Sequence, residues 1–378
     1  MSVATFARLL VVAALRGIRP GDGSLRTATP RCAGRVLRIG GVAWALAASL
    51  LACDTEQTTD PDLGGEHIDF VFEKADRALC EGSISELDRF IERVFRFLEA
   101  DLSEEYRALV QIVEDAPCPR DACYRRGDRV YMEDLDDPGV RPALTLRHEL
   151  VHAVAHQAWG ATVSFFAEGL AVALSQGAAV VPSSEGPVAV RDMLGDNSLV
   201  LDYWAAGRFV QFLIDTRGLN RFKQVYIGAQ TPSIEAVVGV IEEVYGESFA
   251  DIEAEYLSGA PRCLFQLDVC DVDVAEKVGA GWASTFAVSC DDPDVYGSVG
   301  ADDTVMAARR TIEIESAGTY RLTTEAHLYL SRCGGCDVQF RREFRYSTDL
   351  DIELDAGVYA LEFVETQDTV VEVALVAK

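Results

Sequence analysis

Apolar residues recur at helical spacing through the first two thirds of the chain. Between positions 84 and 98 they fall three or four residues apart, which places them on one face of a helix. The members of this face are Ile84, Leu87, Ile91, Val94, Phe95 and Leu98. Further helices are predicted over 143–158, 166–176, 201–217, 233–246 and 249–258. Two short runs with β-branched centres, 107–114 and 128–134, predict strands, so this region mixes helix and strand.

Beyond Cys270 the pattern changes to an alternation of apolar and polar residues, which is typical of half-buried strands. The alternating runs lie at 284–289, 311–316, 320–325, 337–346, 350–355, 359–365 and 369–376. Short antiparallel strands at this spacing, separated by Gly, Asp and Ser turns, favour a β-sandwich. We therefore predict an α+β domain over 66–262 and an all-β sandwich domain over 271–378, with the boundary near 265–280.

The charge balance excludes one class of partner. Among 378 residues, 61 are acidic and 34 are Lys or Arg, which gives a formal charge of -27. A surface this acidic repels the phosphates of nucleic acids and anionic lipids. Nucleic acid is therefore not an expected partner. The content of hydrophobic residues, 49%, is that of a globular rather than a disordered protein.

The first 53 residues differ in character from the rest of the chain. They combine seven arginines with one acid, and they end in the uncharged apolar run IGGVAWALAASLLAC. A basic flank and a short apolar run describe a secretory signal, since a membrane span takes about 20 residues. Residues 50–53 resemble a bacterial lipobox, which implies a lipid on Cys53; a plain signal or a buried helix is the alternative. The expected location is the bacterial cell envelope, at the outer membrane or cell surface, with residues 54–65 as a flexible tether.

Eight cysteines follow this segment, and an even number behind an export signal indicates disulfides. Proximity along the chain favours Cys263–Cys270. It also favours pairing within the groups 80/118/123 and 290/333/336, each of which leaves one cysteine over. The CxxC at 333–336 has no second CxxC to complete a zinc knuckle, so the disulfide interpretation is preferred there.

The segment RHELVH, residues 147–152, contains the pattern HExxH. On a helix, His148 and His152 lie one above the other, so both imidazoles can reach one ion. Glu149 is displaced from that face and can contact a water on the metal without binding the metal. Neutral nitrogen ligands keep a zinc ion Lewis-acidic, and Glu149 would take the proton of the attacking water and deliver it to the leaving amine. A chance match is the alternative, but two His and a Glu in an otherwise apolar helix need partners.

A third ligand is needed, and two candidates follow on the chain. His156 lies about 12 Å along the helix from His148, too far for the same ion on a straight helix. Its role would then be at the surface or behind the ligands. Glu168 lies inside an apolar run that begins a second helix after Gly160, where an unpaired carboxylate is unfavourable. A helix packed back on the first would present Glu168 to the ion and leave a position open for water, although an exposed helix Glu is the alternative.

HExxH followed by AEGLA at 167–171 resembles the gluzincin metallopeptidases. The resemblance covers about residues 120–260 and implies a zincin-like α+β catalytic domain with one zinc on His148, His152 and Glu168. The later segment LDYWAAGRFVQFLIDTRG is similar to the helix of that family whose tyrosine donates to the oxyanion, and Tyr203 and Gly207 match the tyrosine and the glycine. An aromatic core residue is the alternative role for Tyr203.

The sequence also departs from the family. The spacing from the second His to the Glu is shorter here, and Val172 replaces an acid that often follows the Glu ligand, so Asp202 and Asp192 become the candidates for hydrogen-bonding the ligands from behind. The segment that holds the substrate amine in aminopeptidases is missing, so exopeptidase specificity is not implied. The segment 128–137 could instead be the edge strand that a peptide substrate extends.

These observations predict a secreted, lipid-anchored zinc peptidase whose substrate is a protein or peptide and whose C-terminal domain holds a partner or substrate, or shields the catalytic domain. A surface binding or adhesion lipoprotein without turnover is the alternative. The Asp-rich loop 290–303 lacks the D-x-D-x-D-G order of calcium loops, so zinc is favoured over calcium.

Overall fold

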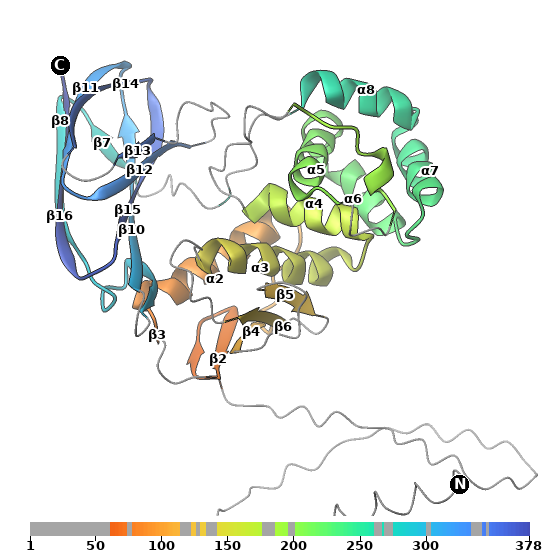
Figure 1. Ribbon diagram of the computed structural model, residues 1–378, viewed down its shortest axis with the longest axis horizontal. Helices are drawn as coiled ribbons and strands as arrows, with labels where there is room; N and C mark the ends of the chain where they lie inside the picture. The colour runs from red at the N-terminus through yellow and green to blue at the C-terminus, as the bar shows by residue number, and fades with distance from the viewer. Residues whose placement is uncertain are drawn as a thin grey trace, which may run out of the picture. The chain divides into compact units, whose positions relative to one another are not determined.

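The computed structural model of the protein is shown in Figure 1. It describes residues 61–73, 78–113, 122–125, 129–133, 142–175, 186–195, 201–260, 267, 275–299, 304–333, 342–344 and 348–378. Residues 58–378 form one compact unit with two hydrophobic cores. One core is built from residues between Ile68 and Tyr256, and the other from residues between Val278 and Leu375 together with Cys80. The coarse prediction of an α+β region followed by a β-rich region is confirmed; the predicted signal segment and Cys53 lie outside the described residues.

The α+β region begins with a five-stranded sheet in the order β1-β2-β4-β6-β5. Its strands are β1 (Leu63–Gly64), β2 (Ile68–Phe72), β4 (Ala108–Val113), β5 (Ala122–Arg125) and β6 (Arg129–Glu133). Strands β2, β4 and β6 are parallel, whereas β5 runs antiparallel to β6 at the edge. The expectation that 128–137 provides the edge strand is wrong, because the hairpin folds β5 outside β6 and leaves β6 between two partners.

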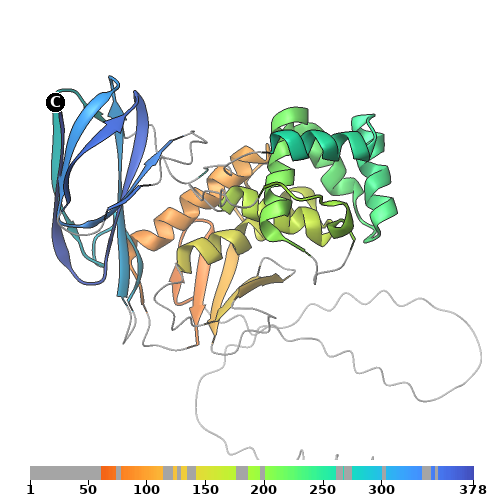
Figure 2. The ribbon, with the colours of Figure 1, turned by 45° about the horizontal axis from the view of Figure 1, so that its top comes forward.

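Two helices, α2 (Glu81–Phe97) and α3 (Pro142–Trp159), lie on the same face of this sheet (Figure 1 and Figure 2). The apolar face predicted for α2 is buried except for Ile84, which is half-buried, and Phe90 completes the face. It packs into a core with alternate residues of β2 and β4 such as Phe70 and Val110, because β-strand side chains alternate between faces. Helix α3 lies beside α2 over β5 and β6.

A helical layer follows, made of α4 (Ser164–Ser175), α5 (Tyr203–Arg217), α6 (Leu219–Gly228), α7 (Ile234–Tyr245) and α8 (Phe249–Gly259), with the short helix η2 (Arg191–Met193) before α5. Serine side chains cap α7 and α8, where Ser233 and Ser248 accept from backbone N–H groups. Helix α6 is absent from the predicted elements. Gly218 ends α5 and is the single residue between α5 and α6, so no loop marks the start of a second helix.

The β-rich region is a sandwich of two sheets whose inner faces share the second core. One sheet has the order β14-β11-β16-β8, from β8 (Gly281–Val288), β11 (Gly318–Thr324), β14 (Thr348–Leu354) and β16 (Thr369–Ala377). The other has the order β13-β12-β15-β10-β9-β3, with β7 (Glu276–Val278) beside β10. Its strands are β9 (Val295–Val299), β10 (Thr304–Ile314), β12 (His327–Arg332), β13 (Arg342–Phe344), β15 (Gly357–Glu365) and β3 (Ala78–Leu79).

Strand β3 comes from the N-terminal region, directly before α2, yet it extends the sheet of the sandwich through β9. A disulfide joins Cys80, after β3, to Cys290, after β8, across 210 residues. It links one cysteine from each of the two groups that proximity had set apart. Cys123 and Cys333 are also disulfide-bonded, while Cys263 and Cys270 lie outside the described residues.

Within the described ranges, no single helix has the length and apolar character to cross a membrane. One bent pair, Leu146–Trp159 with Ser164–Ser175, meets those two criteria together, and the helix axis turns by 119° between its members.

Candidate metal centre

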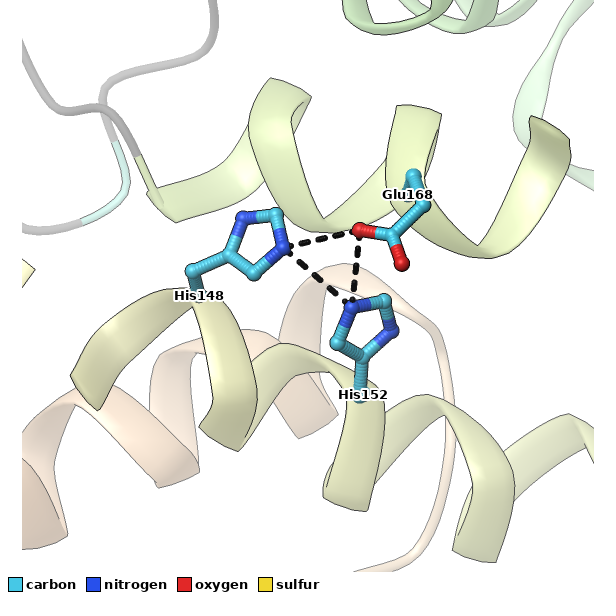
Figure 3. A group of neighbouring side chains, drawn as sticks. All are labelled: His148, His152 and Glu168. Atoms are coloured by element: carbon cyan, nitrogen blue, oxygen red, sulfur yellow. Dashed lines mark hydrogen bonds and ion pairs between the residues drawn. The ribbon is translucent and has the colours of Figure 1, made fainter. Parts of the chain in front are cut away.

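The three predicted ligands meet at one point. His148 and His152 project from successive turns of α3, and Glu168 projects toward them from α4 (Figure 3). The Nε2 atoms of His148 and His152 lie 3.0 and 3.2 Å from Glu168 Oε2 and 3.3 Å from each other. Ligands about 2.05 Å from a tetrahedral zinc are separated by about 3.4 Å. The spacing of the three donor atoms therefore fits a zinc ion between them.

Hydrogen bonding alone is a poor description of this triangle. If both rings donated to the single oxygen of Glu168, their two N–H groups would also face each other across 3.3 Å. A cation shared by all three atoms removes that conflict, because each nitrogen then presents a lone pair. The chemistry of the donor set, two imidazoles and one carboxylate, is that of catalytic zinc sites.

The turn between α3 and α4 makes this meeting possible. Helix α3 ends where Gly160 adopts a φ of 87°, a conformation that glycine takes without strain. The chain then turns by 119° into α4, which is buried almost all around. Only three residues separate Gly160 from the start of α4. This compact turn lets Glu168 reach the imidazoles despite the short spacing between His152 and Glu168 in the sequence.

Helix α4 is fixed from its other side by α5. A Cβ on Gly169 would lie 2.7 Å from Val210 Cγ2 and 2.8 Å from the carbonyl oxygen of Ala206. A Cβ on Gly207 would lie 2.6 Å from Val172 Cγ1. The two helices therefore approach so closely that only glycine fits at both positions, and this contact sets the position of the neighbouring Glu168.

The electrostatics of the cluster place a carboxylate charge beside the two rings. Burial raises the pKa of the Glu168 carboxyl, but hydrogen bonds from His148 and His152 outweigh it and hold that pKa far below its ordinary range. Burial lowers the pKa of His152, and the Glu168 carboxylate outweighs it and raises that pKa. Glu168 is thus ionised in neutral water and attracts positive charge to the two rings.

Glu149 is buried, with 7% of its surface exposed. Within the part of the chain that the structure describes, its carboxylate forms no hydrogen bond or ion pair, although its charge acts on His152. A buried carboxylate without a protein partner is unfavourable unless water or a ligand solvates it. Its place beside the donor triangle and its lack of structural bonds suit a group that handles a proton.

The other predicted residues take different places. The Tyr203 ring, at the start of α5, lies 6.2 Å from the His148 ring. Asp202 caps α5, and its Oδ1 accepts from Ala205 N at 3.0 Å; no hydrogen bond within the described ranges joins it to His148 or His152. Asp202 thus has a capping role, its support of a ligand stays a prediction, and Asp192 is exposed on η2. His156 is not part of the triangle, in agreement with its distance along α3.

One aromatic side chain beside the centre was missed by sequence reasoning. Tyr124, on the edge strand β5, stacks on the His152 ring with centroids 6.4 Å apart, and its ring lies 5.9 Å from that of His156. Strand β5 has only four residues and no alternating pattern, so the sequence carries no signal for this contact. Tyr226 on α6 is also nearby: burial, Tyr124 and Glu168 all raise the pKa of its phenol. Its helical spacing from Phe222 could have indicated a buried face.

Two further groups of possible ligands are less well built. Glu66 and His67, directly before β2, gather with Glu92 on α2, but both carboxylates lie 3.9 Å from His67 Nε2 and Glu66 is mostly exposed. In the described part of the Asp-rich loop, 290–299, Asp292 accepts from Asp294 N and Asp294 pairs with Arg310. Neither arrangement has the close convergence seen at His148, His152 and Glu168.

Comparisons with known proteins add little. No family model matches the chain, and no curated protein is significantly similar in sequence. A solved pre-peptidase C-terminal domain of a collagenase from Bacillus anthracis aligns with 13% identity over 28% of this chain and 94% of that chain, with a TM-score of 0.19. Hydroxypropylphosphonic acid epoxidase from S. wedmorenis aligns with 14% identity over 45% of this chain and 96% of that chain, with a TM-score of 0.15. Such low scores carry no argument about function.

Proposed function

We propose that the protein is a zinc-dependent peptidase with a gluzincin-type catalytic region. The convergence of His148 Nε2, His152 Nε2 and Glu168 Oε2 within 3.3 Å is the observation that carries the proposal. It is supported by the local architecture, in which the HExxH helix lies over a mostly parallel sheet with an antiparallel edge strand. A zinc ion held by these three residues would supply a Lewis acid that polarises the scissile carbonyl and acidifies a water.

Glu149 is the general base of this reaction. Its side chain is buried on the ligand helix α3 and has no structural bond to break among the described residues. It removes a proton from the attacking water and returns a proton to the leaving amine, so that the peptide bond is hydrolysed with no net change in Glu149. Tyr203, whose ring lies 6.2 Å from that of His148, donates a hydrogen bond from its phenol to the developing oxyanion.

The substrate is an extended peptide segment. Strand β5 lies at the sheet edge beside α3, and an extended chain can add to such an edge through backbone hydrogen bonds. Tyr124 on this strand borders His152 and offers an aromatic surface to a side chain of the substrate. The signal-like segment and the lipobox resemblance at residues 50–53 support export and a lipid anchor on Cys53 in a bacterial envelope.

The test is a Glu149→Gln variant, which keeps the shape of the side chain but removes the base. We expect one zinc per chain in both proteins and a loss of about 10²- to 10⁴-fold in hydrolysis of an unfolded protein substrate. Glu243→Gln is the matched control, because Glu243 is an exposed glutamate on α7. Mass spectrometry of the peptides made by the wild type and not by Glu149→Gln also defines the cleavage preference.

Two results would contradict the proposal. Wild-type protein that binds no zinc at stoichiometric concentration would remove the metal centre. Protein that binds one zinc but cuts no substrate pool, with Glu149→Gln behaving as wild type, would favour the alternative of a surface binding lipoprotein without turnover.

A further inference from the structure

A buried ion cluster joins the helix of the metal ligands to the β-sandwich. Glu86, on α2, accepts from Arg147 on α3 at 2.7 Å and from Arg309 on β10 at 3.0 Å, both at the same oxygen Oε1. Arg89 binds the other oxygen, Oε2, at 3.2 Å. Glu86 and Arg147 are both almost fully buried, so this cluster is shielded from water.

The cluster continues into the sandwich. Arg309 donates to Tyr296 Oη at 3.0 Å and to Glu362 Oε2 at 3.3 Å, while Tyr296 donates its own proton to Glu362 at 2.8 Å. Positive and negative groups therefore alternate along the series Arg147, Glu86, Arg309 and Glu362. Burial raises the pKa of Glu86, but Arg309, Arg147 and Arg89 outweigh it and hold that pKa below its ordinary value, so the cluster keeps its charges in neutral water.

The place where α2 meets the sandwich is also tied by the backbone. Ser83 Oγ donates to Gly297 O and accepts from Gly297 N, each at 2.9 Å. A Cβ on Gly82 would lie 2.5 Å from Pro293 O, so α2 and the loop before β9 are in direct contact. With the Cys80–Cys290 disulfide and the β3–β9 pairing, these bonds hold Glu86 at a fixed distance from β10.

Arg147 is the residue directly before the first ligand, His148. Its guanidinium is held between Glu86 and the face of Phe90, 5.6 Å from the ring centroid. A bond to the backbone neighbour of a ligand restricts rotation and sliding of α3, and a displacement of about 1 Å in such a site can cost about 100-fold in rate. The arginine on the sandwich side completes the charge balance that keeps Arg147 in place.

We propose that Arg309 is a positioning residue for the metal centre, and that the β-sandwich is a structural part of the catalytic unit that fixes α3 through Glu86 and Arg147. The inference rests on the proposed zinc peptidase function and extends it to the role of the second region. The sandwich thereby contacts, through Glu86, the residue directly before the ligand His148.

The experiment compares Arg309→Met with wild type in the full chain. Methionine keeps an unbranched apolar stem but removes the guanidinium and its charge. We expect about tenfold or greater weakening of zinc affinity in a chelator competition, a kcat about tenfold lower with little change in KM, and an altered visible spectrum of the cobalt-substituted protein. Arg309→Lys, which keeps the charge, should recover part of each loss.

The matched control is Arg321→Met, an ion-paired arginine on β11 of the same sandwich, whose carboxylate partners lie on β14. It should leave zinc affinity, spectrum and kcat unchanged. If Arg309→Met does not fold, Tyr296→Phe decides, because it removes only the hydroxyl between Arg309 and Glu362; we then expect about a threefold loss of zinc affinity.

A folded Arg309→Met, or in its place Tyr296→Phe, with wild-type zinc affinity, cobalt spectrum and kcat would overturn the positioning role. Failure of the proposed function has a different signature, since the wild type would then bind no zinc or cut no peptide. In that case the role of Arg309 is measured by amide hydrogen exchange of α3 residues 146–155. Faster exchange in the variant would confirm that Arg309 holds α3 in place, and unchanged exchange would overturn this role.

Discussion

A Gly→Ala substitution should have opposite effects on stability at Gly169, where α4 contacts α5, and at Gly239, which has no close neighbour. Gly169→Ala places a methyl group 2.7 Å from Val210 Cγ2 and 2.8 Å from the Ala206 carbonyl oxygen. The second neighbour is backbone, which cannot rotate away, so α4 must move from α5 by several tenths of an ångström. Because Glu168 is the adjacent residue, the same movement displaces the carboxylate from the two imidazoles.

The magnitude follows from two opposing contributions. Alanine in a helix interior is more stable than glycine by about 0.5–1 kcal/mol. Overpacking of a tight contact costs about 1–3 kcal/mol. The net change for Gly169→Ala is then a loss of up to about 2.5 kcal/mol of unfolding free energy. Gly239→Ala on α7 has no neighbour within 4 Å, so it should gain the helix contribution alone, about 0.5–1 kcal/mol.

The assay is denaturant unfolding of both variants with zinc removed and with zinc in excess. Gly169→Ala should lose stability in both conditions and lose more with zinc, because the displaced Glu168 binds the ion more weakly and mass action then stabilises the fold less. Gly239→Ala should gain stability and keep the zinc increment of the wild type. Equal stabilisation by both substitutions would refute the close packing that we assign to α4 and α5.

Two further outcomes are expected. Folding lowers the pKa of Glu86, so its ionised carboxylate stabilises the fold at pH values above its ordinary pKa of 4.5, and this contribution is lost as the pH falls. The difference in unfolding free energy between wild type and Glu86→Gln, measured in urea, should therefore shrink from pH 7 to pH 4. A constant difference would contradict the buried ion cluster. Cys53→Ala, expressed in a bacterium that processes lipoproteins, should move the protein from the membrane fraction to the soluble fraction and abolish palmitate labelling, whereas unchanged fractionation would contradict the lipid anchor.

Local patterns in the sequence predicted the parts of the site that depend on local geometry. The pair His148 and His152 needs only a helix to come together, and the apolar surroundings of Leu150 and Val151 specify that helix. Glu168 was predicted because a carboxylate in an apolar helix must have a partner, and the break at Gly160 was predicted too, but no local pattern specifies the angle of the turn there. Metal binding at these three residues stays a prediction.

Contacts between distant segments could not be predicted in the same way. The pairing of Cys80 with Cys290 and the strand β3 that joins the sandwich depend on where α2 packs, which no local pattern specifies. The edge position of β5 follows from a hairpin whose first strand has only four residues. Strand β12 was missed although His327 to Leu330 alternate in burial, because only three of its six residues are apolar or aromatic and Ser331 and Arg332 end the alternation.

Anomalous diffraction at the zinc edge tests the central claim, which is that one ion is held jointly by α3 and α4. Crystals grown with one equivalent of zinc should give a single strong peak about 2.0–2.2 Å from the Nε2 atoms of His148 and His152 and from a carboxylate oxygen of Glu168. A peak elsewhere, or one that contacts the two imidazoles while Glu168 points away from it, would contradict the account.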